Sequence, residues 1–160
     1  FAVAKTTGEL ASGYDCLVHV GLAAATHWVR LERFAHNLRM KADNPCEEND
    51  PDDVVVLDPT GPLALDTSFP VEQLKRYLGS AWDVRHSRDA GTYVCNATYY
   101  WSLKHAATSR VVFVHVPAWN PVEARVFGNR LGQCVLACLD QNTHEAPTDS
   151  MLTSSASEMS

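Results

Sequence analysis

Two neighbouring stretches decide the fold: residues 87–103, SRDAGTYVCNATYYWSL, and residues 111–117, VVFVHVP. A strand-like segment at 82–86 precedes the first stretch. The apolar spacing that follows predicts a helix that begins near Tyr93 or Val94 and continues to about residue 107. The second stretch predicts a strand closed by its proline. Strand, helix and strand in succession indicate an α/β domain, and we expect three layers, α/β/α, around a largely parallel, mixed sheet.

The rest of the chain continues this alternation. Further strands are predicted at 16–20, 28–34 and 54–57, and helices at 70–78 and 121–139, the last with an apolar stripe from Val122 to Leu139. We expect residues 1–140 to form one domain. Residues 141–160 are polar and rich in Ser and Thr, which predicts a disordered tail.

A cysteine and a histidine stand twenty residues apart in the two stretches. Cys95 begins the predicted helix, where the helix dipole and a nearby imidazolium would favour the reactive thiolate. His115 ends the predicted strand, and His86 and His105 are the alternative bases. Because the carboxyl ends of parallel strands meet at one edge of a sheet, we expect Cys95 and His115 to meet there. The alternative is a buried, inert cysteine.

A carboxylate, Glu32, lies in the alternating segment 28–34, on the mostly polar face that also carries Arg30. Glu32 would then point into a cleft and orient the imidazole, or lie at the surface paired with Arg30. Cys95, His115 and Glu32 together make a candidate triad of a cysteine hydrolase.

Charge, apolar content and cysteine count argue against some kinds of partner and location. A formal net charge of −6 argues against nucleic acid as a partner, and no apolar run reaches the length of a membrane span. Five cysteines, an odd number without a C-x-x-C motif, suggest reduced thiols and a cytoplasmic protein. Cys134 and Cys138 lie one helical turn apart and are expected in the core. The acidic stretch 47–53 is expected to be a solvated loop, and no metal or cofactor is expected.

These stretches resemble pyroglutamyl peptidase I, the pyrrolidone carboxyl peptidase family. The family's cysteine motif, S-x-x-A-G-x-Y-x-C-N-x-x-x-Y-x-x-L, matches residues 87–103. Its histidine motif, F-x-H-V-P, matches residues 113–117, and its glutamate motif, E-R-x-A-x-N, matches residues 32–37. The resemblance runs from about Tyr14 to Leu139 with the three motifs in the family's order, and it implies the family's phosphorylase/hydrolase-like fold.

The resemblance implies a thiol peptidase that removes N-terminal pyroglutamate from peptides through a thioester acyl-enzyme. It makes Cys95 the nucleophile, His115 the general base and then acid, and Glu32 the residue that orients the imidazole. Backbone N–H groups at the start of the Cys95 helix would bind the oxyanion. The expected substrate-binding residues are Tyr93, Val94 and Leu22.

The chain also departs from the family. Family members begin with a strand and a loop of the kind G-F-x-P-F, whereas thirteen residues without that loop precede Tyr14. We therefore expect the family domain to be N-terminally incomplete. Arg39 or Lys41 is a candidate cation near the oxyanion. The alternative function is a catalytically impaired relative or fragment that acts as a binding or assembly subunit, and a homo-oligomer remains open.

Overall fold

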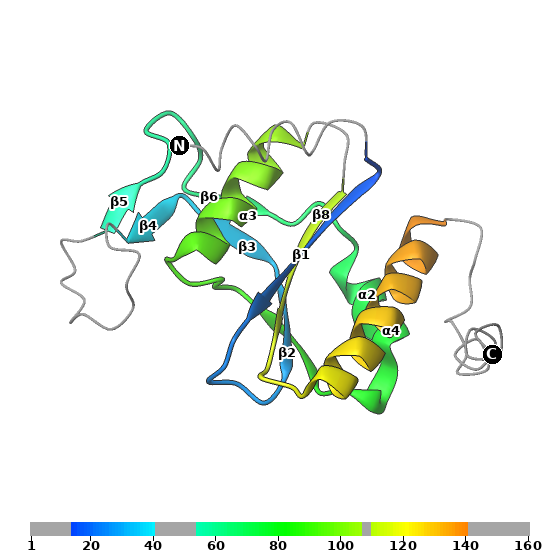
Figure 1. The fold of residues 1–160 in the computed structure, drawn as a ribbon. Coiled ribbons are helices and arrows are strands. Elements are labelled where there is room, and N and C mark those ends of the chain that lie inside the picture. Colours follow the sequence, from blue (N-terminus) through cyan, green and yellow to red (C-terminus); the bar gives the residue numbers. More distant parts are fainter. Residues whose placement is uncertain (1–13, 41–53, 107–109, 141–160) are drawn as a thin grey trace.

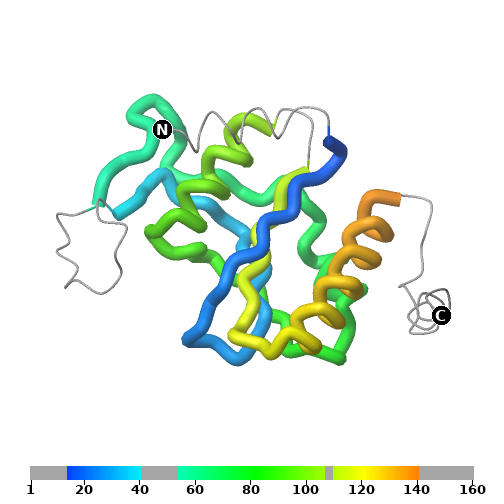
Figure 2. Tube along the Cα trace, viewed as in Figure 1, coloured from blue at the N-terminus to red at the C-terminus, as the bar shows by residue number. Residues whose placement is uncertain are grey.

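A four-stranded mixed sheet with the order β1-β8-β2-β7 forms the centre of the computed structural model, which describes residues 14–40, 54–106 and 110–140 (Figure 1). The strands are β1 (Cys16–Leu22), β8 (Arg110–Val116), β2 (Val29–Glu32) and β7 (Val84–Ser87). β1 and β8 are parallel and run side by side in Figure 2. β2 is antiparallel to β8 and parallel to β7. The expected mixed α/β sheet is confirmed.

Helices cover the two faces of this sheet. β8 is apolar on both faces, and successive residues of a strand point to opposite sides. Val111 and Phe113 pack in a cluster with α3 (Val94–His105). Val112 and Val114 pack in a second cluster with α2 (Val71–Leu78) and α4 (Pro121–Leu139). The result is the expected α/β/α arrangement (Figure 1).

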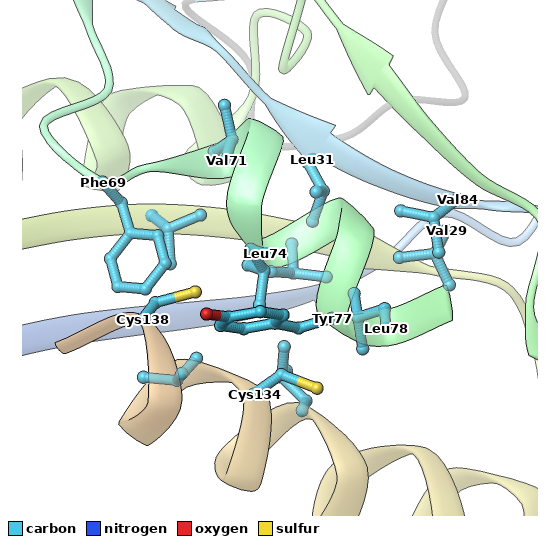
Figure 3. Packing of buried hydrophobic residues seen from close by; sticks show 14 of the residues in the cluster. Val29, Leu31, Phe69, Val71, Leu74, Tyr77, Leu78, Val84, Cys134 and Cys138 are labelled. Atoms are coloured by element: carbon cyan, nitrogen blue, oxygen red, sulfur yellow. The ribbon is translucent and has the colours of Figure 1, made fainter. Parts of the chain in front are cut away.

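The larger core cluster lies between the sheet, α2 and α4. Figure 3 shows Tyr77 of α2 beside Cys134 and Cys138 of α4. The two cysteines are buried, as predicted, and burial raises the pKa of Cys138 to about 12. α2 ends where the sequence predicted, and Gly79, with a φ of 70°, turns the chain into the short 3-10 helix η2 (Gly79–Ala81).

The bounds of α4 are also those predicted. The Asn120 side chain accepts hydrogen bonds from the N–H groups of Val122 and Glu123, and the Glu123 carboxylate accepts one from Asn120 N. The predicted apolar stripe is wrong in its first two members, because Val122 and Val126 are 62% and 44% exposed. The buried face of the helix begins at Phe127, so the first turn extends past the core.

The predicted strand 28–34 is in fact two strands. β2 ends at Glu32, and β3 (Phe34–His36) pairs in a separate small sheet with β6 (Ala64–Asp66). Arg33 lies at the break, where its N–H donates to Ser87 O and its carbonyl accepts from Thr67 N. A further small sheet joins β4 (Leu38–Met40) to β5 (Val54–Val56), which confirms the predicted strand at 54–57. β3, β4 and β6 were not predicted as separate strands.

Among the described residues, no helix has the length and apolar character needed to cross a membrane. The acidic stretch 47–53, Lys41 and the predicted tail lie outside the described residues.

Candidate active site

The pairing of β2 with β8 brings Glu32 and His115 to one face of the sheet. In the antiparallel register Arg30 lies opposite His115, and Glu32 lies opposite Phe113. Opposed residues of antiparallel strands project from the same face, and diagonal neighbours are within reach of long side chains. The face that carries these residues is the one covered by α3, because Phe113 belongs to the cluster that packs on that helix.

Glu32 and His115 form a buried hydrogen-bonded pair. His115 Nδ1 lies 2.8 Å from Glu32 Oε1, and the two residues are 4% and 0% exposed. Because a carboxylate only accepts, Nδ1 carries the proton, which leaves Nε2 as the acceptor in the neutral ring. Arg30 Nε donates to the same carboxylate oxygen over 2.9 Å. The alternative of a surface glutamate is therefore wrong, because Glu32 is buried; its pairing with Arg30 exists, but beside the contact with the imidazole and not in place of it.

Cys95 is the second residue of α3. Tyr93, in extended conformation, precedes the helix, and no side chain caps it, so the first-turn N–H groups point outward at its positive end. Burial acts to lower the pKa of His115. Hydrogen bonds with Cys95 and Glu32, together with the carboxylate charge, outweigh this effect and raise the pKa above its ordinary value. Unlike Cys134, which is fully buried, Cys95 is half-buried.

The sheet-edge argument for this pair was wrong. β7 runs parallel to β2, and β2 runs antiparallel to β8. β7 and β8 therefore point in opposite directions, and their carboxyl ends do not meet on the same side of the sheet. Cys95 instead comes to His115 because α3 packs across the face of the sheet.

Two buried side chains of α3 fix the helix to the chain that follows Glu32. Asn96 accepts from His36 N and donates to the carbonyls of His36 and Leu38, over 2.7–2.8 Å. The Tyr99 hydroxyl donates to the Glu32 carbonyl over 3.0 Å. Sequence reasoning gave neither residue a role, although an asparagine inside an apolar helical pattern is a signal of a buried hydrogen-bonding site.

A glycine completes the packing around the imidazole. Gly21 of β1 lies opposite His115 in register. A Cβ added at Gly21 would lie 3.0 Å from His115 Cδ2 and 2.8 Å from Phe113 Cε1. The rings of Phe113 and His115 are 4.7 Å apart. The missing side chain of Gly21 thus lets both rings pack against the backbone of β1.

The predicted substrate-binding residues lie at different depths. Tyr93 is half-buried, directly before α3, whereas Val94 and Leu22 are 60% and 64% exposed. Leu22 pairs with Val116, next to His115 in the chain. Arg39 lies on β4, and Met40 N donates to Thr92 O near the start of α3.

The alternative histidines have other partners. His86 Nε2 lies 3.1 Å from Glu72 Oε2, and His105 Nδ1 lies 2.9 Å from Trp101 O near the end of α3. Among the described residues, no group of three His, Cys, Asp or Glu side chains is arranged to hold a metal ion.

A solved structure with this fold is a peptidase. The crystal structure of pyrrolidone carboxyl peptidase from Thermus thermophilus matches with a TM-score of 0.64 and 28% identity, covering 82% of this chain and 78% of that one. A profile of the pyroglutamyl peptidase family matches residues 2–129, so the chain belongs to the pyroglutamyl peptidase family.

Curated relatives agree with this assignment. Human pyroglutamyl-peptidase 1 is 33% identical over 128 residues, which are 78% of this chain and 58% of the relative. The pyrrolidone-carboxylate peptidase of Pyrococcus furiosus is 32% identical over 108 residues, or 64% of this chain and 51% of that protein. The chain therefore spans a little more than half the length of these relatives.

Proposed function

We propose that this protein is a cysteine peptidase that removes N-terminal pyroglutamate from peptides, with Cys95, His115 and Glu32 as its triad. The observation that carries the proposal is the buried Glu32–His115 hydrogen bond of 2.8 Å, beside which Cys95 lies half-buried in the first turn of α3 and acts to raise the pKa of His115. This is the order of contacts that a nucleophile, a base and an orienting carboxylate require.

The first half of the reaction forms the acyl-enzyme. His115 Nε2 accepts the Cys95 proton, and the thiolate attacks the carbonyl carbon of the pyroglutamyl residue. The tetrahedral intermediate then collapses: the C–N bond breaks, the imidazolium gives its proton to the leaving amine, and a thioester remains on Cys95. Glu32 stabilises the imidazolium through Nδ1 while it exists.

The second half releases pyroglutamate. Neutral His115 accepts a proton from water as the hydroxyl adds to the thioester carbonyl. The C–S bond then breaks, and the Cys95 thiolate recovers a proton from the imidazolium. In both halves the oxyanion would accept hydrogen bonds from backbone N–H groups at the uncapped start of α3.

The substrate pocket belongs to the same proposal. A pyroglutamyl lactam is compact and neutral, and it suits an apolar slot with a few hydrogen bonds. Val94, an exposed apolar side chain, lies directly before Cys95. Leu22 pairs with Val116, which packs on the α2 and α4 face of the sheet, so Leu22 projects from the face opposite that of the imidazole. Tyr93 would add a half-buried wall. The proposed partners are thus pyroglutamyl peptides.

The test is release of a fluorescent amine from a pyroglutamyl amide by the purified chain under reducing conditions. Cys95→Ser should abolish turnover, whereas the matched variant Cys16→Ser should retain it. Cys16 is also half-buried, but burial raises the pKa of its thiol to about 11, which makes it unreactive at neutral pH. Circular dichroism of each variant confirms that the chain is folded.

Turnover that survives in folded Cys95→Ser would remove Cys95 from the mechanism. A folded wild-type chain that binds the lactam without turnover would favour the alternative, a binding or assembly subunit. A cytoplasmic location and a homo-oligomeric state stay predictions, to be checked by fractionation and by sedimentation.

A further inference from the structure

Within the described residues, one oxygen of the Glu32 carboxylate accepts every hydrogen bond that this side chain makes. Oε1 lies 2.8 Å from His115 Nδ1, 2.9 Å from Arg30 Nε and 2.8 Å from Arg30 Nη2. The other oxygen, Oε2, is buried and has no hydrogen-bond partner in the part of the chain that the structure describes. The guanidinium and the imidazole therefore share a single acceptor atom.

Arg30 makes a further contact, with the turn that leads to the nucleophile. Its Nη2 donates to Asp89 O over 3.1 Å. In that turn the Asp89 carboxylate accepts from Gly91 N over 2.8 Å, four residues before Cys95. One side chain thus holds both the carboxylate and the turn from which the Cys95 helix starts.

The shared oxygen has an electrostatic consequence. A carboxylate next to an imidazole favours the imidazolium, whereas a second cation beside the same pair disfavours it. Arg30 Nε, Arg30 Nη2 and His115 Nδ1 all lie within 2.9 Å of Glu32 Oε1. The guanidinium and the imidazole are therefore close neighbours. The Arg30 side chain is 25% exposed, so solvent weakens this effect without removing it.

We propose that Arg30 is a positioning residue that holds Glu32 for His115 and, by sharing its charge, makes the imidazole less basic than Glu32 alone would. The inference rests on the proposed function, because the basicity of His115 matters only if His115 exchanges protons with Cys95. Arg30 thereby lowers the pH at which neutral His115 becomes available as the base.

Among the residues that the structure describes, few other titratable groups face His115. β1 contributes His19, whose ring stacks on Phe113 and whose pKa is lowered by burial. β2 contributes Arg30 and Glu32. α3 contributes Cys95, and Tyr99, whose burial raises the pKa of its hydroxyl far above neutral pH. Of these groups, Arg30 is the one with a permanent positive charge.

The experiment follows the ring resonances of His115 by NMR across a pH titration of the full chain, with His115→Gln used for assignment. Two neutral variants, Arg30→Gln and Arg30→Thr, are compared with Arg30→Lys, which keeps the charge. The matched control is Arg85→Gln. Arg85 is the register neighbour of Arg30 on β7, but its guanidinium hydrogen-bonds Asp83 over 2.7 Å instead.

The neutral variants should raise the midpoint of His115 by about 0.5 to 1 pH unit, since a nearby cation is lost from a partly solvated site. Arg30→Lys should show less than half of that shift, and Arg85→Gln should stay close to wild type. The pH dependence of Cys95 alkylation, read by peptide mass spectrometry, should change in the neutral variants and not in Arg85→Gln.

An unchanged His115 midpoint in either folded neutral variant overturns the proposal, and so does an equal shift in Arg85→Gln. Neither readout needs a substrate. Failure of the wild-type chain to hydrolyse a pyroglutamyl amide would therefore count against the proposed function and leave the titration result standing.

Discussion

Replacing Gly21 by alanine tests the packing around the imidazole directly. The added Cβ would lie 2.8 and 2.9 Å from two ring carbons of Phe113 and 3.0 Å from His115 Cδ2. Side chains essentially never make contacts this short, so a ring or the strand has to move. The backbone itself does not resist the change, because Gly21 is not among the glycines with positive φ.

The expected loss of stability in Gly21→Ala depends on how closely the rings of Phe113 and His115 are packed. Phe113 is 4% exposed, and its ring lies 5.7 Å from that of Tyr99 and 4.7 Å from that of His115. Overpacking at such a site costs about 1 to 3 kcal/mol. The lower backbone entropy of alanine returns roughly 0.5 to 1 kcal/mol. The difference is a net loss of about 0 to 2.5 kcal/mol, with a centre near 1 kcal/mol, and each kcal/mol lowers Tm by roughly 2 to 4 °C in a domain of this size.

The assay pairs urea denaturation with the rate of pyroglutamyl amide hydrolysis. A shift of the imidazole by a few tenths of an ångström should lower kcat by about 10-fold, because reacting groups must be held closely. The matched control is Gly132→Ala. A Cβ at Gly132 meets nothing within 4 Å, so alanine in this helix should add about 0.5 to 1 kcal/mol.

If Gly21→Ala unfolds at the same urea concentration as wild type, the close approach of β1 to the two rings is not part of the native packing. If stability falls while kcat and its pH profile stay unchanged, the position of His115 does not depend on Gly21.

Four smaller predictions follow from other buried groups. Asn96→Ala should lower the free energy of unfolding by about 2 to 4 kcal/mol, measured with urea, because three part-buried backbone groups lose their partner. Tyr99→Phe should lower the free energy of unfolding by about 1 to 2 kcal/mol in the same assay, because the hydrogen bond to the Glu32 carbonyl is lost. A loss larger than that of Asn96→Ala would contradict this prediction. Cys134→Ser should cost about 1 to 3 kcal/mol by placing a hydroxyl in the core, and an unchanged Tm would contradict this. The pKa of His115 is raised in the folded state, so its stabilising contribution should be full below about pH 6.5 and should decline as pH rises through the raised value; the stability difference between wild type and His115→Gln at pH 5.5 and 9 measures it.

The helices could be predicted because their ends carry local signals. Pro121 and Asn120 mark the start of α4, and Gly79 marks the end of α2, in the sequence as in the structure. These signals act through residues a few positions apart, which a single sequence contains. The apolar stripe of α4 was wrong at Val122 and Val126, since the sequence does not say how far the sheet extends beneath the helix.

The sheet could be predicted only in outline. Alternating apolar residues indicate strands, but they specify neither the partner of a strand nor its direction. The antiparallel pairing of β2 with β8 was therefore missed, although it is the contact that joins Glu32 to His115. The break at Arg33 was missed because the alternation from Val29 onward does not mark it. The motif resemblance selected the site residues, whereas the contacts of Arg30 follow from the pairing of β2 with β8, and those of Gly21 from the pairing of β1 with β8.

The separation of the paired residues along the chain sets when the site forms during folding. Glu32 and His115 are 83 residues apart, and Asn96 and His36 are 60 apart. Contacts of this span require closure of long loops, and domains in which such contacts make up a larger share fold more slowly. The helices can form from local interactions alone. In a refolding experiment, helical signal should therefore recover before the His115 environment does, and the reacting groups should assemble only with the last closure of the sheet.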